Sequence, residues 1–196
     1  MKRSHIRTLR ELILFAMLGA IMFTSKLVME ALPNIHLVGA LTMAYTIVYR
    51  AKALAPIYVY VALTGLYLGF APGAWEHNLY IWAVLWGATM LLPKRIPRKV
   101  ARFVYPAVCC LHGLFFGVLS APVYAILFGL NFEQTLIYIA KGIGFDITHA
   151  IGNLVAGVLV LPVSELLLKL EKSASRSLRH TNRDHVARPE EKSVEK

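Results

Sequence analysis

The sequence predicts an all-α integral membrane protein with six transmembrane helices and both termini in the cytoplasm. Hydrophobic residues make up 57% of the 196 and charged residues only 16%, a balance far from that of soluble domains. Apolar stretches of membrane-spanning length fill almost all of residues 11–170. Basic residues gather in alternate connections between these stretches, and this pattern sets the orientation.

The first four helices are bounded by turn-forming and basic segments. The first is expected from about Glu11 to Leu32, because Pro33 and Asn34 break the pattern. The next three are expected at about His36–Tyr49, Ala53–Phe70 and Leu79–Leu92. The fourth is short for a span and is expected to begin earlier or to lie tilted.

The last two helices are longer. The fifth is expected from about Phe103 to Gly129, with Pro106 and Pro122 kinking it or marking its ends. The sixth is expected from about Thr135 to Leu170, with its last turns emerging into the cytoplasm. Residues 1–170 are thus expected to form one six-helix transmembrane domain. Residues 171–196 are polar and charged, which favours a disordered cytoplasmic tail.

The distribution of charge fixes the predicted topology. All but two of the 21 Lys and Arg residues fall in the amino-terminal segment, the second and fourth connections, and the carboxyl-terminal part from Lys169 onward. These segments are therefore predicted to be cytoplasmic, and the net charge of +10 reflects orientation rather than nucleic-acid binding. The two exceptions, Lys26 and Lys141, lie inside predicted helices.

The predicted sixth helix carries an unusual polar face. Lys141, Asp146, His149 and Asn153 fall within one arc of an ideal helix inside an apolar run. A charged side chain at a helix centre costs about 2.5 to 3.5 kcal/mol to insert, and such residues normally face a cavity or a bundle interior. The face is either a ligand-binding surface or a structural polar knot in which Asp146 and His149 satisfy each other or Lys141.

A second polar pair lies in the first helix. Lys26 and Glu30, at i,i+4, form either a salt bridge or two ligands for a zwitterion. Lys26 and Lys141 lie at comparable depth in the outer half, which favours an outward-facing pocket with aromatic walls from Tyr80, Trp82 or Trp86.

Two outer connections add polar and aromatic residues, which either close over the pocket or reflect turn polarity and an interfacial aromatic belt. The predicted substrate-binding residues are Lys26, Glu30, Asn34, His36, Trp75, His77, Lys141, Asp146, His149 and Asn153.

Catalytic and nucleotide-binding motifs are missing from the sequence. There is no GxxxxGK[ST], CxxC or HExxH pattern. Asp146, His149 and His112 have unspecific spacing for a metal site, so neither a metal nor another cofactor is predicted. Ser120 and Ser164 lack any hydrolase motif, and the chain is not expected to be an enzyme.

Three sequence features resemble the substrate-binding S component of energy-coupling factor (ECF) transporters, which are ABC importers of vitamins and other micronutrients. These are the AxxxA motif Ala16–Ala20 on the first helix, the GxxxDxxH-like stretch Gly142–His149, and the run Leu32–Leu54. The resemblance covers the six helices but not the tail. It implies a prokaryotic cell-membrane protein that captures a micronutrient at its outer face.

The resemblance also implies partners and a mechanism. The S component would dock through Ala16, Gly19 and Ala20 onto a transmembrane T component driven by a pair of cytoplasmic ATPase subunits, and would topple to release its cargo inside. Small side chains suit such a close, reversible contact. The mixed charges favour a small amphoteric heterocycle, with a slight preference for a queuosine precursor. The alternatives are a stand-alone permease or membrane sensor and, less favoured, an intramembrane enzyme.

Overall fold

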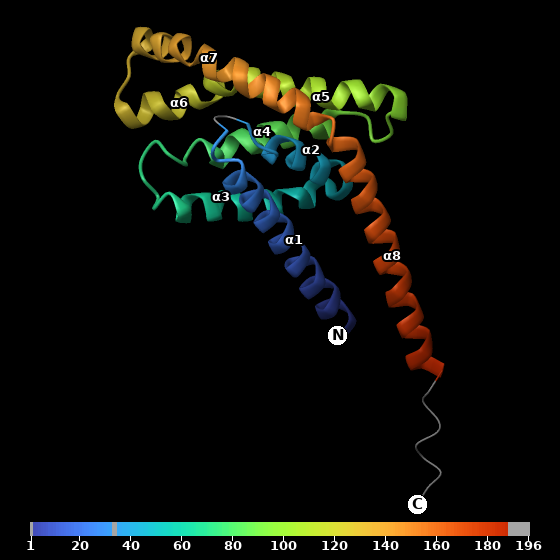
Figure 1. Ribbon diagram of the computed structural model, residues 1–196. Coiled ribbons are helices and arrows are strands. Elements are labelled where there is room, and N and C mark those ends of the chain that lie inside the picture. The colour runs from blue at the N-terminus through green and yellow to red at the C-terminus, as the bar shows by residue number, and fades with distance from the viewer. Residues whose placement is uncertain (1, 33–34, 188–196) are drawn as a thin grey trace, which may run out of the picture.

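The computed structural model describes residues 2–32 and 35–187, with side chains for residues 9–32 and 35–176. Within these ranges the chain is helical and contains no strand. Figure 1 shows the helices, which are α1 (Lys2–Val28), α2 (Val38–Tyr49), the 3₁₀ helix η1 (Arg50–Ala53), α3 (Leu54–Tyr67), α4 (Asn78–Leu91), α5 (Arg98–Leu114), α6 (Phe116–Phe128), α7 (Phe132–Gly157) and α8 (Val160–Ala187). Asn34, one of the predicted substrate-binding residues, lies outside the described residues.

Several of these helices are long and apolar enough to cross a membrane. Among the described residues, three stretches qualify, Leu9–Val28, Val38–Tyr67 and Arg98–Phe128. The helices α7 and α8, bent by 44° at the break between them, add a fourth if they count as one broken span. The apolar helix α4 has only 14 residues. The structure is thus compatible with a helical membrane bundle, and the count of six spans stays a prediction.

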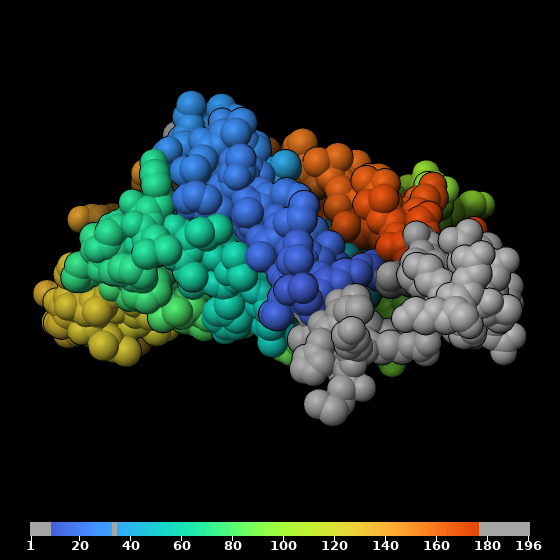
Figure 2. All heavy atoms as spheres, turned by 90° about the horizontal axis from the view of Figure 1, so that it is seen from below, coloured from blue at the N-terminus to red at the C-terminus, as the bar shows by residue number. Residues whose placement is uncertain are grey.

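Helix α1 packs closely along α3, and Gly19 makes this approach feasible. A Cβ atom at Gly19 would lie 2.5 Å from Cγ1 of Val59 and 2.8 Å from the carbonyl oxygen of Pro56. A further contact joins α1 to α2, where the Tyr45 hydroxyl donates to the carbonyl of Leu18. Figure 2 shows α1 in blue across one face of the molecule, with α3 beside it.

The predicted fifth helix is broken into α5 and α6 at Phe115, between the two prolines rather than at either of them. The break lies beside α7, because the backbone N–H of Gly117 donates to a carboxylate oxygen of Asp146 at 2.9 Å. This bond satisfies one of the free N–H groups in the first turn of α6. The helix then ends at Gly129, whose φ of 63° is the left-handed conformation that glycine adopts readily.

The predicted sixth helix is also divided, into α7 and α8. Asn131 and Gln134 begin α7 with a reciprocal capping box, in which each side chain accepts from the other's backbone N–H at 2.9 Å. At its far end α8 continues to Ala187, so residues 171–187 are helical where a disordered tail was expected. None of these residues is glycine or proline, so nothing in their backbone chemistry stops the helix.

Ion pairs join the start of α1 to η1 and to α8 at one end of the molecule, and tie the start of α5 to α8. The pairs are Arg10–Glu171 (3.4 Å), Lys52–Glu11 (2.7 Å) and Arg98–Glu165 (3.0 Å). All six side chains are about one-third exposed or more, so each pair contributes at most about 1 kcal/mol. The pairs nevertheless involve all four segments that are predicted to be cytoplasmic, namely the amino-terminal segment, the second and fourth connections, and the carboxyl-terminal part.

Candidate ligand-binding site

Four histidines gather around Trp82 in the interior. His36 comes from the connection before α2, His77 from the turn before α4, His112 from α5 and His149 from α7. The His36 ring centroid lies 5.0 Å from that of His149 and 5.8 Å from that of Trp82, whose ring is 5.5 Å from His112. We call these residues, with Phe116 and Asn153, the histidine cluster.

Phe116 links the remaining histidine, His77, to the cluster. Its ring lies 4.7 Å from His149 and 5.7 Å from His77, centroid to centroid. Trp82 is held in place by its indole N–H, which donates to the Asn78 side chain at 2.7 Å. The rings therefore meet edge to face or tilted, the arrangement that aromatic quadrupoles favour.

Polar atoms in the cluster lack partners although they are buried. Among the described residues, the unpaired atoms of the cluster are His36 Nδ1, His77 Nδ1, His112 Nδ1, His149 Nε2, Asn153 Oδ1 and Asn153 Nδ2. Buried polar groups in folded proteins almost always have a hydrogen-bond partner, and each unpaired one costs about 1 to 3 kcal/mol. A concentration of such atoms in one place marks a site where a polar ligand would be stabilised.

Asn153 is the most enclosed member of the cluster, with 0% of its surface exposed. It lies between two glycines from other helices. A Cβ atom at Gly39 on α2 would be 3.2 Å from Asn153 Oδ1, and one at Gly113 on α5 would be 2.8 Å from Asn153 Nδ2. Three helices therefore converge on this amide with no room for larger side chains.

Asp146 faces the same interior but has a structural partner. Its carboxylate accepts from Gly117 at the first turn of α6, where the partial positive charge of the helix favours an anion. This contact is structural, but its partner on α6 is neither His149 nor Lys141, the partners that the predicted polar knot gave to Asp146. His149, one turn further along, is directed at the aromatic rings instead.

The charge of Lys26 reaches the cluster from α1. Burial, together with the nearby His149 and Lys26, lowers the pKa of His36 to about 3. Burial also lowers the pKa of His77 to about 4, again with a contribution from Lys26. Both histidines, which lie in connections outside the candidate spans, are therefore neutral near pH 7, and in each ring one nitrogen is a donor and the other an acceptor. In His77 the Nε2 atom already contacts the Asn78 side-chain amide at 3.3 Å, which leaves Nδ1 for a ligand.

Three predicted site residues lie elsewhere in the structure. Lys141 is exposed on α7. Glu30 is exposed and accepts a hydrogen bond from the Tyr67 hydroxyl at 3.2 Å. Trp75 packs edge to face on Phe70, with centroids 5.0 Å apart, in the connection between α3 and α4.

The three residues predicted to dock a partner helix separate into two environments. Ala16 and Ala20 are exposed on α1, beside the exposed side chains of Ile13 and Met17. Gly19 is buried against α3 and takes no part in this exposed face.

Two members of the cluster were predicted neither as substrate-binding residues nor as aromatic walls. His112 was considered only as a metal ligand, yet an ionisable residue inside an apolar helix is itself a sign of a functional site. Phe116 gives no such sign, because one phenylalanine among many apolar residues is unremarkable. Of the predicted aromatic walls, Trp82 is central, whereas Tyr80 donates to the Leu119 carbonyl and Trp86 to the Arg50 carbonyl.

A cavity where α4 leads into α5 has no residue of the cluster in its lining. No group of three or more His, Cys, Asp and Glu side chains in the described part of the chain is arranged to hold a metal ion. The cluster is instead suited to hydrogen bonding and ring stacking with an organic molecule, once its side chains part to admit one.

Taken together, these features define an all-helical chain with membrane-spanning stretches and a closed, polar and aromatic interior site. No protein-family model, curated protein or solved structure matches the chain.

Proposed function

We propose that the chain is the substrate-capture S component of an ECF-type importer, and that the histidine cluster binds its cargo. The observation that carries this proposal is the concentration of unpaired, buried polar atoms in the cluster. An apolar helical chain gains nothing in stability from such atoms, so a bound ligand is the simplest reason for them to be there.

The chemistry of the cluster favours a small planar heterocycle. Neutral imidazoles and a carboxamide present both donors and acceptors, which match the ring nitrogens and carbonyl groups of a heterocyclic base. Trp82 and Phe116 offer ring faces for stacking. A deazapurine precursor of queuosine fits this description and is the favoured cargo.

Access to the cluster is proposed to run past the connection between α1 and α2. Ile35 lies against Gly152 on α7, where a Cβ atom would approach its Cγ1 to 3.1 Å, and the neighbouring His36 contacts His149. Movement of Ile35 and His36 away from α7 would uncover the cluster. Loop motions of this kind are common in binding proteins and occur without unfolding of the helices.

Delivery is proposed to use the exposed face of α1. Ala16 and Ala20 present small side chains that allow a T component helix to approach closely. The paired basic segments would face the cytoplasm of a prokaryotic cell, where the ATPase subunits act. Capture outside, docking through α1 and toppling of the whole chain would then move the cargo inward.

Substrate uptake by cells that express the complete importer tests this proposal. Ala16→Trp is expected to abolish uptake and copurification of the ATPase subunits while cargo binding persists. Ala88→Trp, an exposed alanine on α4, is the matched control and should leave uptake unchanged. Normal uptake by the Ala16→Trp variant would contradict docking through α1.

The competing function is a stand-alone permease or membrane sensor. The exposed apolar side chains of α1 would then face lipid or a second copy of the chain. Copurification distinguishes the S component from a stand-alone protein, because a stand-alone protein purified from its native membrane carries no ATPase subunit with it.

A further inference from the structure

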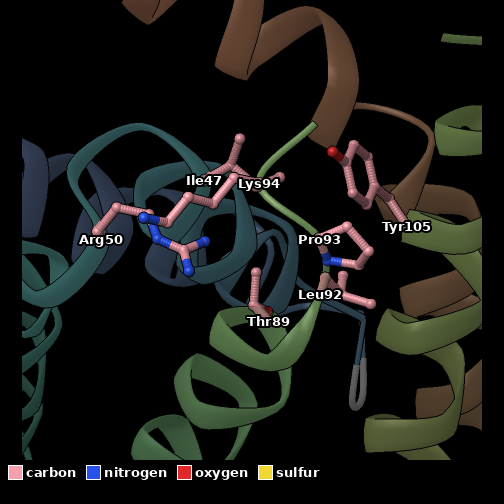
Figure 3. A pocket seen from close by; sticks show the side chains of 7 residues that line it. All are labelled: Ile47, Arg50, Thr89, Leu92, Pro93, Lys94 and Tyr105. Carbon is pink, nitrogen blue, oxygen red and sulfur yellow. The ribbon is translucent and has the colours of Figure 1, made fainter. Parts of the chain in front are cut away.

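A hollow of about 210 Å³ lies where α4 leads into α5, beside the carboxyl-terminal end of α2. Figure 3 shows the side chains that line it, which are Ile47, Arg50, Thr89, Leu92, Pro93, Lys94 and Tyr105. The walls combine two cationic side chains with a phenol and apolar surface. No carboxylate contributes to the lining.

The two cations of the hollow are not neutralised by neighbouring acids. The nearby carboxylates of Glu11, Glu165 and Glu171 are paired with Lys52, Arg98 and Arg10. Neither Arg50 nor Lys94 takes part in an ion pair among the residues whose side chains are described. The hollow therefore keeps an uncompensated positive charge.

Arg50 is held in place at the rim of the hollow. Its backbone φ of 54° is unfavourable for a residue other than glycine. The carbonyl of Arg50 accepts from the Trp86 indole at 3.0 Å, and its guanidinium donates to the Met90 carbonyl at 3.0 Å. Only one nitrogen is used in that bond, so the remaining guanidinium donors are available to an anion. Strained backbone held by its surroundings is a recurrent feature of binding sites.

We infer that this hollow binds a phosphate group through Arg50 and Lys94. Guanidinium and ammonium groups are the usual partners of phosphate, and Arg50 adds directional donors to the point charge of Lys94. Arg95, which follows Lys94 in the chain, raises the local positive potential. The phosphate belongs either to the headgroup of an anionic phospholipid, with the apolar lining facing its glycerol region, or to a soluble phosphate compound.

Thermal unfolding of the purified full-length protein distinguishes these sources. The protein is reconstituted in nanodiscs of phosphatidylcholine, of phosphatidylcholine with phosphatidylglycerol, or of phosphatidylcholine with inorganic phosphate added to the buffer. Lys94→Gln is the test variant, because Lys94 is exposed and its loss should not disturb folding. Lys99→Gln, an exposed lysine outside the hollow, is the matched control.

The inference predicts that phosphatidylglycerol raises the Tm of the wild type and of Lys99→Gln, and raises the Tm of Lys94→Gln by a smaller amount, because weaker binding to the folded state stabilises it less. Stabilisation by inorganic phosphate that Lys94→Gln also weakens would assign the site to a soluble phosphate. Equal responses of Lys94→Gln and Lys99→Gln, or no response of the wild type to either anion, would overturn the inference.

Discussion

The ring of His149 lies 4.7 Å from that of Phe116, the first residue of α6 after the break in the fifth predicted span. One turn earlier on α7, Asp146 accepts from the next residue of α6, Gly117. The same stretch of α7 therefore fixes the start of α6 and supplies a histidine to the cluster. The helix break is thus part of the site, because it sets the position of Phe116 beside His149.

Removal of the Asp146 carboxylate should destabilise the protein. Asp146→Ala is expected to cost about 1 to 3 kcal/mol, because the buried N–H of Gly117 would lose its acceptor. Asp146→Asn keeps an acceptor and should cost less. Thermal unfolding in detergent measures both, with Glu133→Ala at the exposed start of α7 as the control. An unchanged Tm for Asp146→Ala would contradict a structural role for this carboxylate.

Gly113→Ala should disturb the cluster directly. The added Cβ would lie 2.8 Å from Asn153 Nδ2 and 2.9 Å from the His149 carbonyl oxygen, so α5 and α7 would have to move apart. Overpacking of this kind costs about 1 to 3 kcal/mol. Gly87→Ala in α4 is the matched control, because its Cβ meets nothing within 4 Å and should stabilise the helix slightly. Equal Tm values for the two variants would show that the α5–α7 contact is looser than described.

Stability should fall as the pH is lowered below the ordinary histidine pKa. In the folded chain the pKa values of His36 and His77 are lowered to about 3 and about 4, whereas an unfolded histidine titrates near 6.5. Between these values the unfolded state binds more protons, so the stability present above pH 6.5 is lost on acidification, by up to about 1.4 kcal/mol per pH unit for each histidine.

The measurement is Tm at about pH 7 and about pH 5, within this window. The double variant His36→Gln/His77→Gln should show a smaller difference in Tm between these pH values than the wild type. A difference as large as that of the wild type would contradict the role of these two histidines in the loss of stability.

Helical periodicity predicted the buried face of α7 well. Asp146, His149 and Asn153 are all buried, as their shared arc on the helix indicated. Lys141 falls on the edge of that arc yet is exposed, because periodicity gives the direction of a side chain but not which neighbouring helix covers it. The contribution of His36 and His77 depended on long-range packing, although their types and their place in connections were visible in the sequence.

Helix breaks were harder to predict than helices. Pro106 and Pro122 indicated kinks, but the chain breaks at Phe115, where Asp146 from a distant part of the sequence stabilises the new helix start. The composition of residues 171–187 suggested disorder, although their backbone chemistry permits the helix that α8 forms. At Phe115 a long-range interaction decided where the helix breaks. In residues 171–187 the backbone permitted a helix although the composition favoured disorder.

The most direct test of the histidine cluster as a ligand site is mass spectrometry of the small molecules released from the denatured protein. Full-length wild type, His149→Ala and Lys141→Ala would be purified from cells grown in rich medium, with Lys141 as the exposed control on the same helix. We predict that wild type and Lys141→Ala release the same heterocycle and that His149→Ala releases about tenfold less, because it loses a buried hydrogen-bonding group. Equal recovery from His149→Ala and the wild type would contradict the account.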